Sequence, residues 1–240
     1  MTFKNAQQTR VLAGGFHYAT TATGVKFDEA TDMYNVTVLT DRAKTFMPGK
    51  DGSNMSIDMF LDTDTTVGGQ WSNMTNWKAG AAQPFSLGMS GFAVGSEVWM
   101  ANTLQSQFNI TTQQGGPVTA NITGLTDGMF DPGLVLEDLT AVTADGNGTA
   151  RDNGAATANG LVAHLHTIAF SGLTSDVVTI EHSVDGSTSW TTLVTFATQT
   201  AIGSDRQVVA PGTTVRRYLR VVDDVTGTGS ITRFVSVARR

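Results

Sequence analysis

Apolar and polar residues alternate along much of the chain, in short runs separated by Gly, Asn, Asp and Pro. A period of two is typical of β-strands that pack one face against a core. In the first half, the alternation predicts strands at residues 34–40 and 55–61. Residues 47–54 (MPGKDGSN) lie between them, and their Pro-Gly and Asp-Gly pairs predict a loop.

Two segments of the first half lack this alternation. Residues 62–80 are polar but contain Trp71 and Trp77, which predicts a long loop with apolar anchors. Residues 96–110 are the best candidate for a helix, because Ser96 can cap its start and an acidic residue follows in the first turn. The apolar spacing within this candidate is irregular.

The alternation becomes cleaner from residue 131 onward. It predicts strands, mostly with short turns between them, at residues 134–143, 161–170, 177–184, 190–196, 206–210, 216–222 and 231–238. Such a series is typical of a β-sandwich or barrel.

The predicted fold is therefore mainly β. We expect a β-sandwich or barrel with at most one short helix in residues 1–130, and a second, C-terminal β-sandwich region in residues 131–240. The Gly- and Asp-containing stretch 124–133 marks the expected boundary. A weak similarity between residues 56–58 (SID) and 179–181 (TIE) leaves an old duplication open as an alternative to an added domain.

Composition limits the chemistry. The chain has 240 residues, a formal net charge of −6 and no Cys, so neither disulfides nor thiolate metal sites can form. An acidic surface is a poor general binder of nucleic acid. The first ten residues contain no apolar leader, and no run of 18 apolar residues occurs. We expect a soluble protein that is made in the cytoplasm and has no membrane partner.

Three histidines are the strongest candidates for a metal site. His164 and His166 lie two residues apart on a predicted strand and project from one face, and His182 lies on a strand that can pair nearby. A small metal-dependent enzyme would use them; the alternative is a polar sheet face. The acidic pair Asp223 and Asp224 is adjacent, so its side chains point to opposite faces and make no acid/base pair. With no catalytic motif present, we expect no enzyme, no metal and no cofactor.

Trp190 follows a DGSTS turn, a position from which a carbohydrate-binding module could stack a sugar on the indole. The alternative is core packing, the commoner fate of a Trp on an alternating strand.

Basic residues concentrate at the C-terminus. Residues 206–240 hold seven Arg and two Asp, a net charge of +5, which leaves −11 elsewhere. Arg mixed with Tyr and Val favours a protein–protein contact, because its stem packs on apolar surface while its head pairs with carboxylates. The predicted strands 216–222 and 231–238 therefore form a candidate subunit interface through Arg216, Arg217, Tyr218, Arg220 and Arg233. The alternative is pairing within the chain.

Several motifs carry a resemblance to a known family. The run EHSVDGSTSWTTLVTF, the RYLRV motif and a last strand that ends in Arg resemble the closing part of structural proteins of tailed bacteriophages. The first half is similar to tail tube (major tail) proteins of long-tailed phages, in which an early strand leads through a Pro-Gly loop (here TFMPG, 45–49) into a strand of the SIDMFLD kind. It departs from the family where a clear mid-chain amphipathic helix is usual.

The resemblance implies a structural protein of the virion tail, assembled in the host cytoplasm. Its copies would form rings, six to a ring or three if the halves are duplicates, and the rings would stack into a tube. DNA would pass through an acidic lumen without specific binding, and the partners would be other copies and other tail proteins. Pro48, Trp71 and Trp77 join the candidate interface. The alternative is a head-decoration or adhesin module that binds surface glycans through Trp190.

Overall fold

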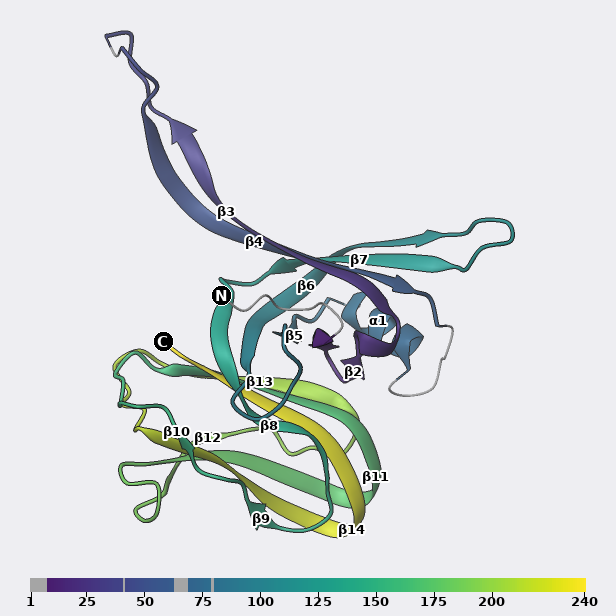
Figure 1. Ribbon diagram of the computed structural model, residues 1–240, viewed down its shortest axis with the longest axis vertical. Coiled ribbons are helices and arrows are strands. Elements are labelled where there is room, and N and C mark those ends of the chain that lie inside the picture. Colours follow the sequence, from purple (N-terminus) through teal and green to yellow (C-terminus); the bar gives the residue numbers. More distant parts are fainter. Residues whose placement is uncertain (1–7, 41, 63–68, 79) are drawn as a thin grey trace.

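A computed structural model describes residues 8–40, 42–62, 69–78 and 80–240, and it confirms the mainly β prediction (Figure 1). The described part contains one α-helix, α1, and one turn of 3-10 helix, Tyr18–Thr20. The strands are β1 (Arg10–Ala13), β2 (Phe16–His17), β3 (Ala22–Asn35), β4 (Phe46–Phe60), β5 (Gln83–Gly88), β6 (Glu97–Thr111), β7 (Thr119–Thr126), β8 (Asp131–Val142), β9 (Gly146–Asn147), β10 (Arg151–Asp152), β11 (Leu161–Ser183), β12 (Thr191–Thr195), β13 (Gly203–Val209) and β14 (Tyr218–Arg239).

The first half is built on four antiparallel strands in the order β3-β4-β7-β6. Burial alternates along residues 52–60 of β4, where Met55, Ile57 and Met59 point into the core and the residues between them point outward. Helix α1 (Gln70–Lys78) covers the inward face, because its Met74 and Trp77 belong to the same apolar cluster as those β4 side chains. The outward face of this sheet is mostly polar and also exposes Phe60, Leu104 and Leu125.

The predicted loop at residues 47–54 is wrong, because this segment lies within β4. The strand predicted at residues 34–40 is also wrong beyond Asn35, where β3 ends. Pro48 fits in a strand because β7 pairs with β4 only from Asn54 onward, so Pro48 lies where β4 has no neighbour but β3. Residues 29–40 and 42–53 thus belong to a two-stranded hairpin that projects far from the body in Figure 1, and we call it the arm.

The helix was predicted in the wrong place. Residues 97–111 form strand β6, which pairs with β5, β7 and β8 over successive parts of its length. The helix instead occupies 70–78, inside the segment expected to be a loop, of which residues 63–68 and 79 lie outside the described residues. Its buried residues Gln70, Met74 and Trp77 follow at i, i+4 and i+7, the spacing of one helix face.

The second half is organised by two very long strands, β11 and β14, which pair antiparallel over nearly their whole length. Four of the predicted strands are halves of these two, so the turns predicted near residues 171–176 and 223–230 are wrong. Leu165 and Val178 of β11 belong to one apolar cluster. A straight strand would hold them about 40 Å apart at ~3.3 Å per residue, so β11 must bend.

The bend turns the paired strands into two layers of a sandwich. One layer contains β13, the first half of β11, the last half of β14 and β8; the other contains β12, the last half of β11, the first half of β14, β9 and β10. Pairing register shifts three times between Thr167 and Ser175. Gly229 lies there with no room for a Cβ atom, which would overlap the carbonyl oxygen of Ser171.

The two halves are joined by hydrogen bonds and by an apolar cluster. Residues 97–100 of β6 pair with residues 131–134 of β8, so strands of both halves belong to one continuous sheet. Met100 from the first half and Val162 and Phe234 from the second pack in the same cluster. The division into domains 1–130 and 131–240 stays a prediction. No helix in the described part is long and apolar enough to cross a membrane.

Candidate assembly surface and buried polar clusters

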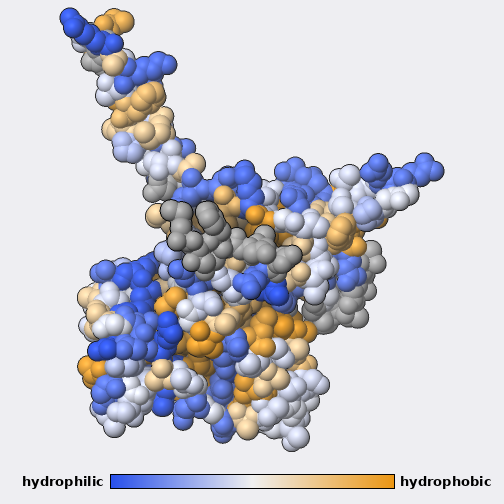
Figure 2. All heavy atoms as spheres, viewed as in Figure 1, coloured by the Kyte–Doolittle hydropathy of each residue, from blue (hydrophilic) through white to orange (hydrophobic). Residues whose placement is uncertain are grey.

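The arm collects exposed apolar side chains at its outer end. Seven of the sixteen large apolar residues that the described chain leaves exposed lie here: Met33, Tyr34, Val36, Val38, Leu39, Phe46 and Met47. Leu39 is fully exposed. Figure 2 shows this apolar material along the arm, with hydrophilic residues at its tip. A concentration of apolar side chains on a projecting element marks a contact surface.

The backbone of the arm is also incompletely paired. Among the strands that the structure describes, β3 pairs only with β4, so no described strand lies along its other edge. The tip is held locally: Thr37 Oγ1 donates to Asn35 Oδ1 at 2.5 Å and accepts from the backbone N–H of Thr45 at 2.9 Å. A two-stranded hairpin on its own is only marginally stable in water. A hairpin of this length is therefore expected to pack against, or pair with, a neighbouring molecule.

The outward face of the β3-β4-β7-β6 sheet carries hydroxyl and amide groups with few charges. Asn121 Nδ2 donates to Asp58 Oδ1 at 2.7 Å, and Thr123 donates to Asn121 at 3.2 Å. Lys26 of this face is paired with Asp28 at 2.6 Å, although its side chain remains 69% exposed. The bond between Asn121 and Asp58 joins two neighbouring strands, β7 and β4.

The C-terminal arginines are bonded within the chain, as the alternative reading of the sequence stated. Three of them form ion pairs: Arg217 with Asp152, Arg220 with Glu181, and Arg240 with Asp131. Two donate to uncharged oxygens: Arg216 to Ser189 O and the Thr191 hydroxyl, and Arg239 to the carbonyls of Asn153 and Ala155. Arg217 is half-exposed and lies over the partly buried ring of Tyr218, with 5.0 Å between its Cζ and the ring centre.

Two residues proposed for the interface, Arg233 and Trp77, are buried within the chain. Arg233 has no exposed surface. Trp77 is 1% exposed, and its indole N–H donates to Thr103 O at 3.0 Å inside the first-half core. Trp71 is partly buried against that core, whereas Pro48 is exposed on the arm. Only Pro48 of this set lies on the projecting surface.

Trp190 is partly exposed beside the arginines. The guanidinium of Arg220 lies over its ring, 4.2 Å from the ring centre, while the same guanidinium pairs with Glu181 at 2.7 Å. One face of the indole is therefore occupied by a cation–π contact within the chain. A sugar could stack only on the other face.

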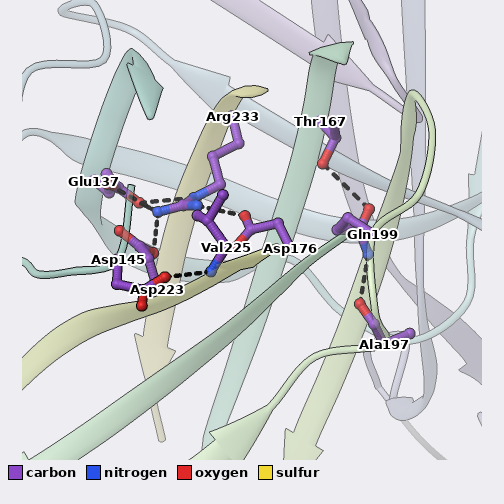
Figure 3. A network of polar contacts seen from close by, with 9 residues as sticks. All are labelled: Glu137, Asp145, Thr167, Asp176, Ala197, Gln199, Asp223, Val225 and Arg233. Carbon is purple, nitrogen blue, oxygen red and sulfur yellow. Dashed lines mark hydrogen bonds and ion pairs between the residues drawn. The ribbon is translucent and has the colours of Figure 1, made fainter. Parts of the chain in front are cut away.

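Arg233 lies at the centre of the first buried polar cluster, drawn in Figure 3. It contacts Glu137 Oε2 at 3.0 Å, Asp176 Oδ2 at 2.6 Å and Asp223. We call these four residues the Arg233 cluster. Burial raises the pKa of Asp223 to about 6, although the Arg233 charge works against the rise. Burial also raises the pKa of Glu137 and of Asp176, again opposed by Arg233.

Ser86, His164 and His166 form the second buried cluster, where the two halves meet. All three are fully buried. His166 Nδ1 lies 2.7 Å from the carbonyl oxygen of Gly14 and must carry the proton, so Nε2 accepts from the Ser86 hydroxyl at 3.0 Å. His164 Nδ1 lies 3.3 Å from the same hydroxyl. A Ser–His pair of this geometry resembles an activated nucleophile, but burial keeps substrates away from it.

The environment keeps both histidines neutral. Burial lowers the pKa of His166 to about 4, and burial together with the neighbouring His166 and Arg206 charges lowers the pKa of His164 further below its usual value. The predicted common face of His164 and His166 is confirmed by their shared contact with Ser86. His182 lies in the other layer, where its Nδ1 accepts from the Arg216 N–H, so the three histidines do not converge.

Sequence reasoning missed most members of these clusters. Ser86 gives no local signal, since it lies 78 residues from His164. Asp176 and Asp223 are separated in sequence from Arg233 by 57 and 10 residues. The one available signal was the mixed face of residues 231–239, where Arg233 alternates with apolar residues. In the described part of the chain, no group of three or more His, Asp or Glu side chains is arranged to hold a metal ion.

Comparison with solved structures finds proteins of phage tails and related particles. The chain is similar to a component of the virion of a native gene transfer agent particle (TM-score 0.40, 10% identity, 53% of this chain and 97% of the other). It is similar to a component of the tail of an empty gene transfer agent particle with C6 symmetry (0.37, 10%, 46% and 80%). It is also similar to the SPP1 Dit (gp 19.1) protein, described as a hub of the adsorption apparatus of phages that infect Gram-positive bacteria (0.41, 10%, 96% and 99%).

TM-scores near 0.4 mark a partial likeness of β architecture, so the function of this chain has to follow from its own residues. No protein-family model matches the chain, and no curated protein matches it.

Proposed function

We propose that this protein is a structural subunit of a bacteriophage tail, which assembles with copies of itself into stacked rings that form the tail tube, and that it is not an enzyme. The arm is the observation that carries the proposal. It combines a strand edge along which no described strand lies with seven exposed apolar residues, and a second copy of the chain is the partner that the sequence resemblance supplies.

The polar sheet face suits the wall of a conduit. Phosphate binding requires accessible Lys or Arg, and Lys26 on the outward face of β3-β4-β7-β6 is paired with Asp28. Amide and hydroxyl groups would let DNA pass without holding it. We therefore propose that this face lines the lumen, that six copies complete a ring and that the arm reaches a neighbouring subunit.

Electron microscopy of the purified protein, combined with light scattering at rising concentration, tests the proposal. We expect rings or tubes with a central hole for the wild type. Leu39→Asp places a charge at the arm tip and should raise the concentration needed for assembly at least tenfold. Val184→Asp is the matched control, because Val184 is also well exposed (64%) but lies in the second half, away from the arm.

The outcomes separate the parts of the proposal. Monodisperse small particles for the wild type would overturn the assembly role and turn attention to a head-decoration or glycan-binding module. Rings that form equally well with Leu39→Asp and Val184→Asp would retain the tube but exclude the arm tip as its contact.

A further inference from the structure

The Arg233 cluster connects the two layers of the C-terminal sandwich. Arg233 pairs in register with Thr167 of β11 and Thr140 of β8, and Glu137 lies on the same β8 strand. Asp223 pairs with Val178, and Asp176 pairs with Val225, both in the other layer. Figure 3 shows the guanidinium reaching from its own strand to carboxylates on neighbouring strands. Its contacts therefore tie one layer to the other beside the bend of β11 and β14.

The charges within the cluster do not balance. Three carboxyl groups face one guanidinium, and the side chains of Asp176 and Asp223 are 0% and 8% exposed. Three further acids lie close enough to add negative potential: Asp138 on β8, Asp145 before β9 and Asp224 on β14. With every carboxyl ionised, the cluster would hold a net charge of −2 away from water. Uncompensated buried charge of this kind is removed by protonation where no counter-ion is present.

Asp176 identifies where a proton is needed. Its side chain is fully buried, Oδ2 accepts from Arg233, and Oδ1 has no hydrogen-bond partner. A buried carboxylate oxygen that accepts no hydrogen bond destabilises the folded state. A proton bound to the cluster lowers its net negative charge, and the coupled carboxyl groups share that proton. The described carboxylates are not arranged to hold a metal ion, which leaves the proton as the counter-charge that these residues can supply themselves.

We propose that the Arg233 cluster is a proton-operated clasp between the two sandwich layers, which retains a shared proton in mildly acidic surroundings and holds the layers less tightly once that proton leaves. The clasp adds a pH response to a protein whose proposed role is purely structural, and it does not depend on that role.

The direction of the response follows from the carboxyl groups. Burial raises the pKa of Asp223 to about 6 in the folded protein, above the value of ~3.9 for an unfolded Asp. The folded state therefore binds more protons than the unfolded state between these values, and its extra stability is present below pH ~4 and lost as pH rises through about 6. Full loss corresponds to a decrease in the folding equilibrium constant on the order of 100-fold.

The test compares Asp223→Asn with Asp224→Asn in the full-length chain. The Asp223→Asn substitution keeps the side chain neutral at every pH and nearly isosteric, whereas Asp224 is the next residue along the strand and lies on the opposite, exposed face. Chemical unfolding is measured from pH 4.5 to 8. We expect the folding constant of the wild type, relative to Asp223→Asn, to fall roughly 25-fold across this range, because part of the full effect lies below pH 4.5. The ratio of wild type to Asp224→Asn should change less than about threefold, since this side chain is exposed and makes no contact with Arg233 that would hold the layers together.

Infrared spectroscopy of carboxyl groups gives a second readout that does not require the variant to fold. Protonated side-chain carboxyl groups should be visible in the folded wild type at pH 5.5, where ordinary Asp and Glu are ionised, and should disappear by pH 8. Absence of that signal in the wild type would overturn the proposal. A wild-type profile parallel to that of Asp223→Asn would overturn it as well.

Discussion

The arm and the C-terminal sandwich invert the usual placement of side chains. The arm exposes Leu39 and six other large apolar residues, while the sandwich encloses the guanidinium of Arg233 completely. Basic residues concentrated near the C-terminus of an acidic chain suggested that the interface lay there. The structure pairs four of those arginines with carboxylates of the same chain and leaves apolar side chains exposed on the arm. A run of charges is therefore weaker evidence of an interface here than apolar side chains that the fold has no means to bury.

Removing the enclosed guanidinium should have the largest effect on folding. Arg233→Met leaves three carboxyl groups without their counter-charge, and breaking a buried pair in this way costs about 3–5 kcal/mol. We expect a loss of that size in the free energy of unfolding at pH 7.5, measured with denaturant, and a smaller loss at pH 4.5, where Asp223 is protonated. Equal losses at the two pH values would show that Arg233 acts through packing alone.

The contrast between buried and exposed apolar residues can be tested with two truncations. Trp77→Ala empties part of the first-half core and removes the hydrogen bond to Thr103 O, so it should lower the free energy of unfolding by about 3–5 kcal/mol. Leu39→Ala removes a side chain that touches little within the chain and should change it by less than ~0.5 kcal/mol. The same Leu39→Ala protein should assemble less readily in light scattering. A large loss of stability with Leu39→Ala would show that the arm folds back onto the body.

The histidine cluster should respond to pH in the direction opposite to the Arg233 cluster. The pKa of His166 is about 4 in the fold against ~6.5 unfolded, so the unfolded state binds more protons in between. Stability is complete above pH ~6.5 and should fall by roughly 3 kcal/mol as pH decreases to 4. His166→Gln should flatten this decrease in denaturant titrations, once the carboxyl contribution has been removed in an Asp223→Asn background. An unchanged slope would mean that His166 already carries a proton.

The sequence predicted the pieces of the fold better than their connections. Alternation located both halves of β11 and of β14, and it placed His164 and His166 on one face. It could not show that the residues near Gly172 and Gly229 continue the strands, because their local sequence resembles that of a turn. In the structure β11 and β14 bend there together and remain paired. The helix was misplaced because Gln70, a polar residue, occupies one of its buried positions. The polar clusters depend on residues far apart in sequence, so only the folded chain brings them together.

The smallest effect should come from the exposed arginine at the edge of the sandwich. Arg217 pairs with Asp152 through two hydrogen bonds of 2.6 Å, but both side chains remain nearly half-exposed, and water screens such a pair. We expect Arg217→Glu to leave the fold intact and to shift the assembly concentration less than about threefold, compared with at least tenfold for Leu39→Asp. Light scattering of the two variants at equal ionic strength measures the difference. If Arg217→Glu weakened assembly as strongly as Leu39→Asp, the basic C-terminal strand would be a subunit contact in addition to its internal pairs. Of the two arginines, only the buried Arg233 would then differ from the arm in taking no part in assembly.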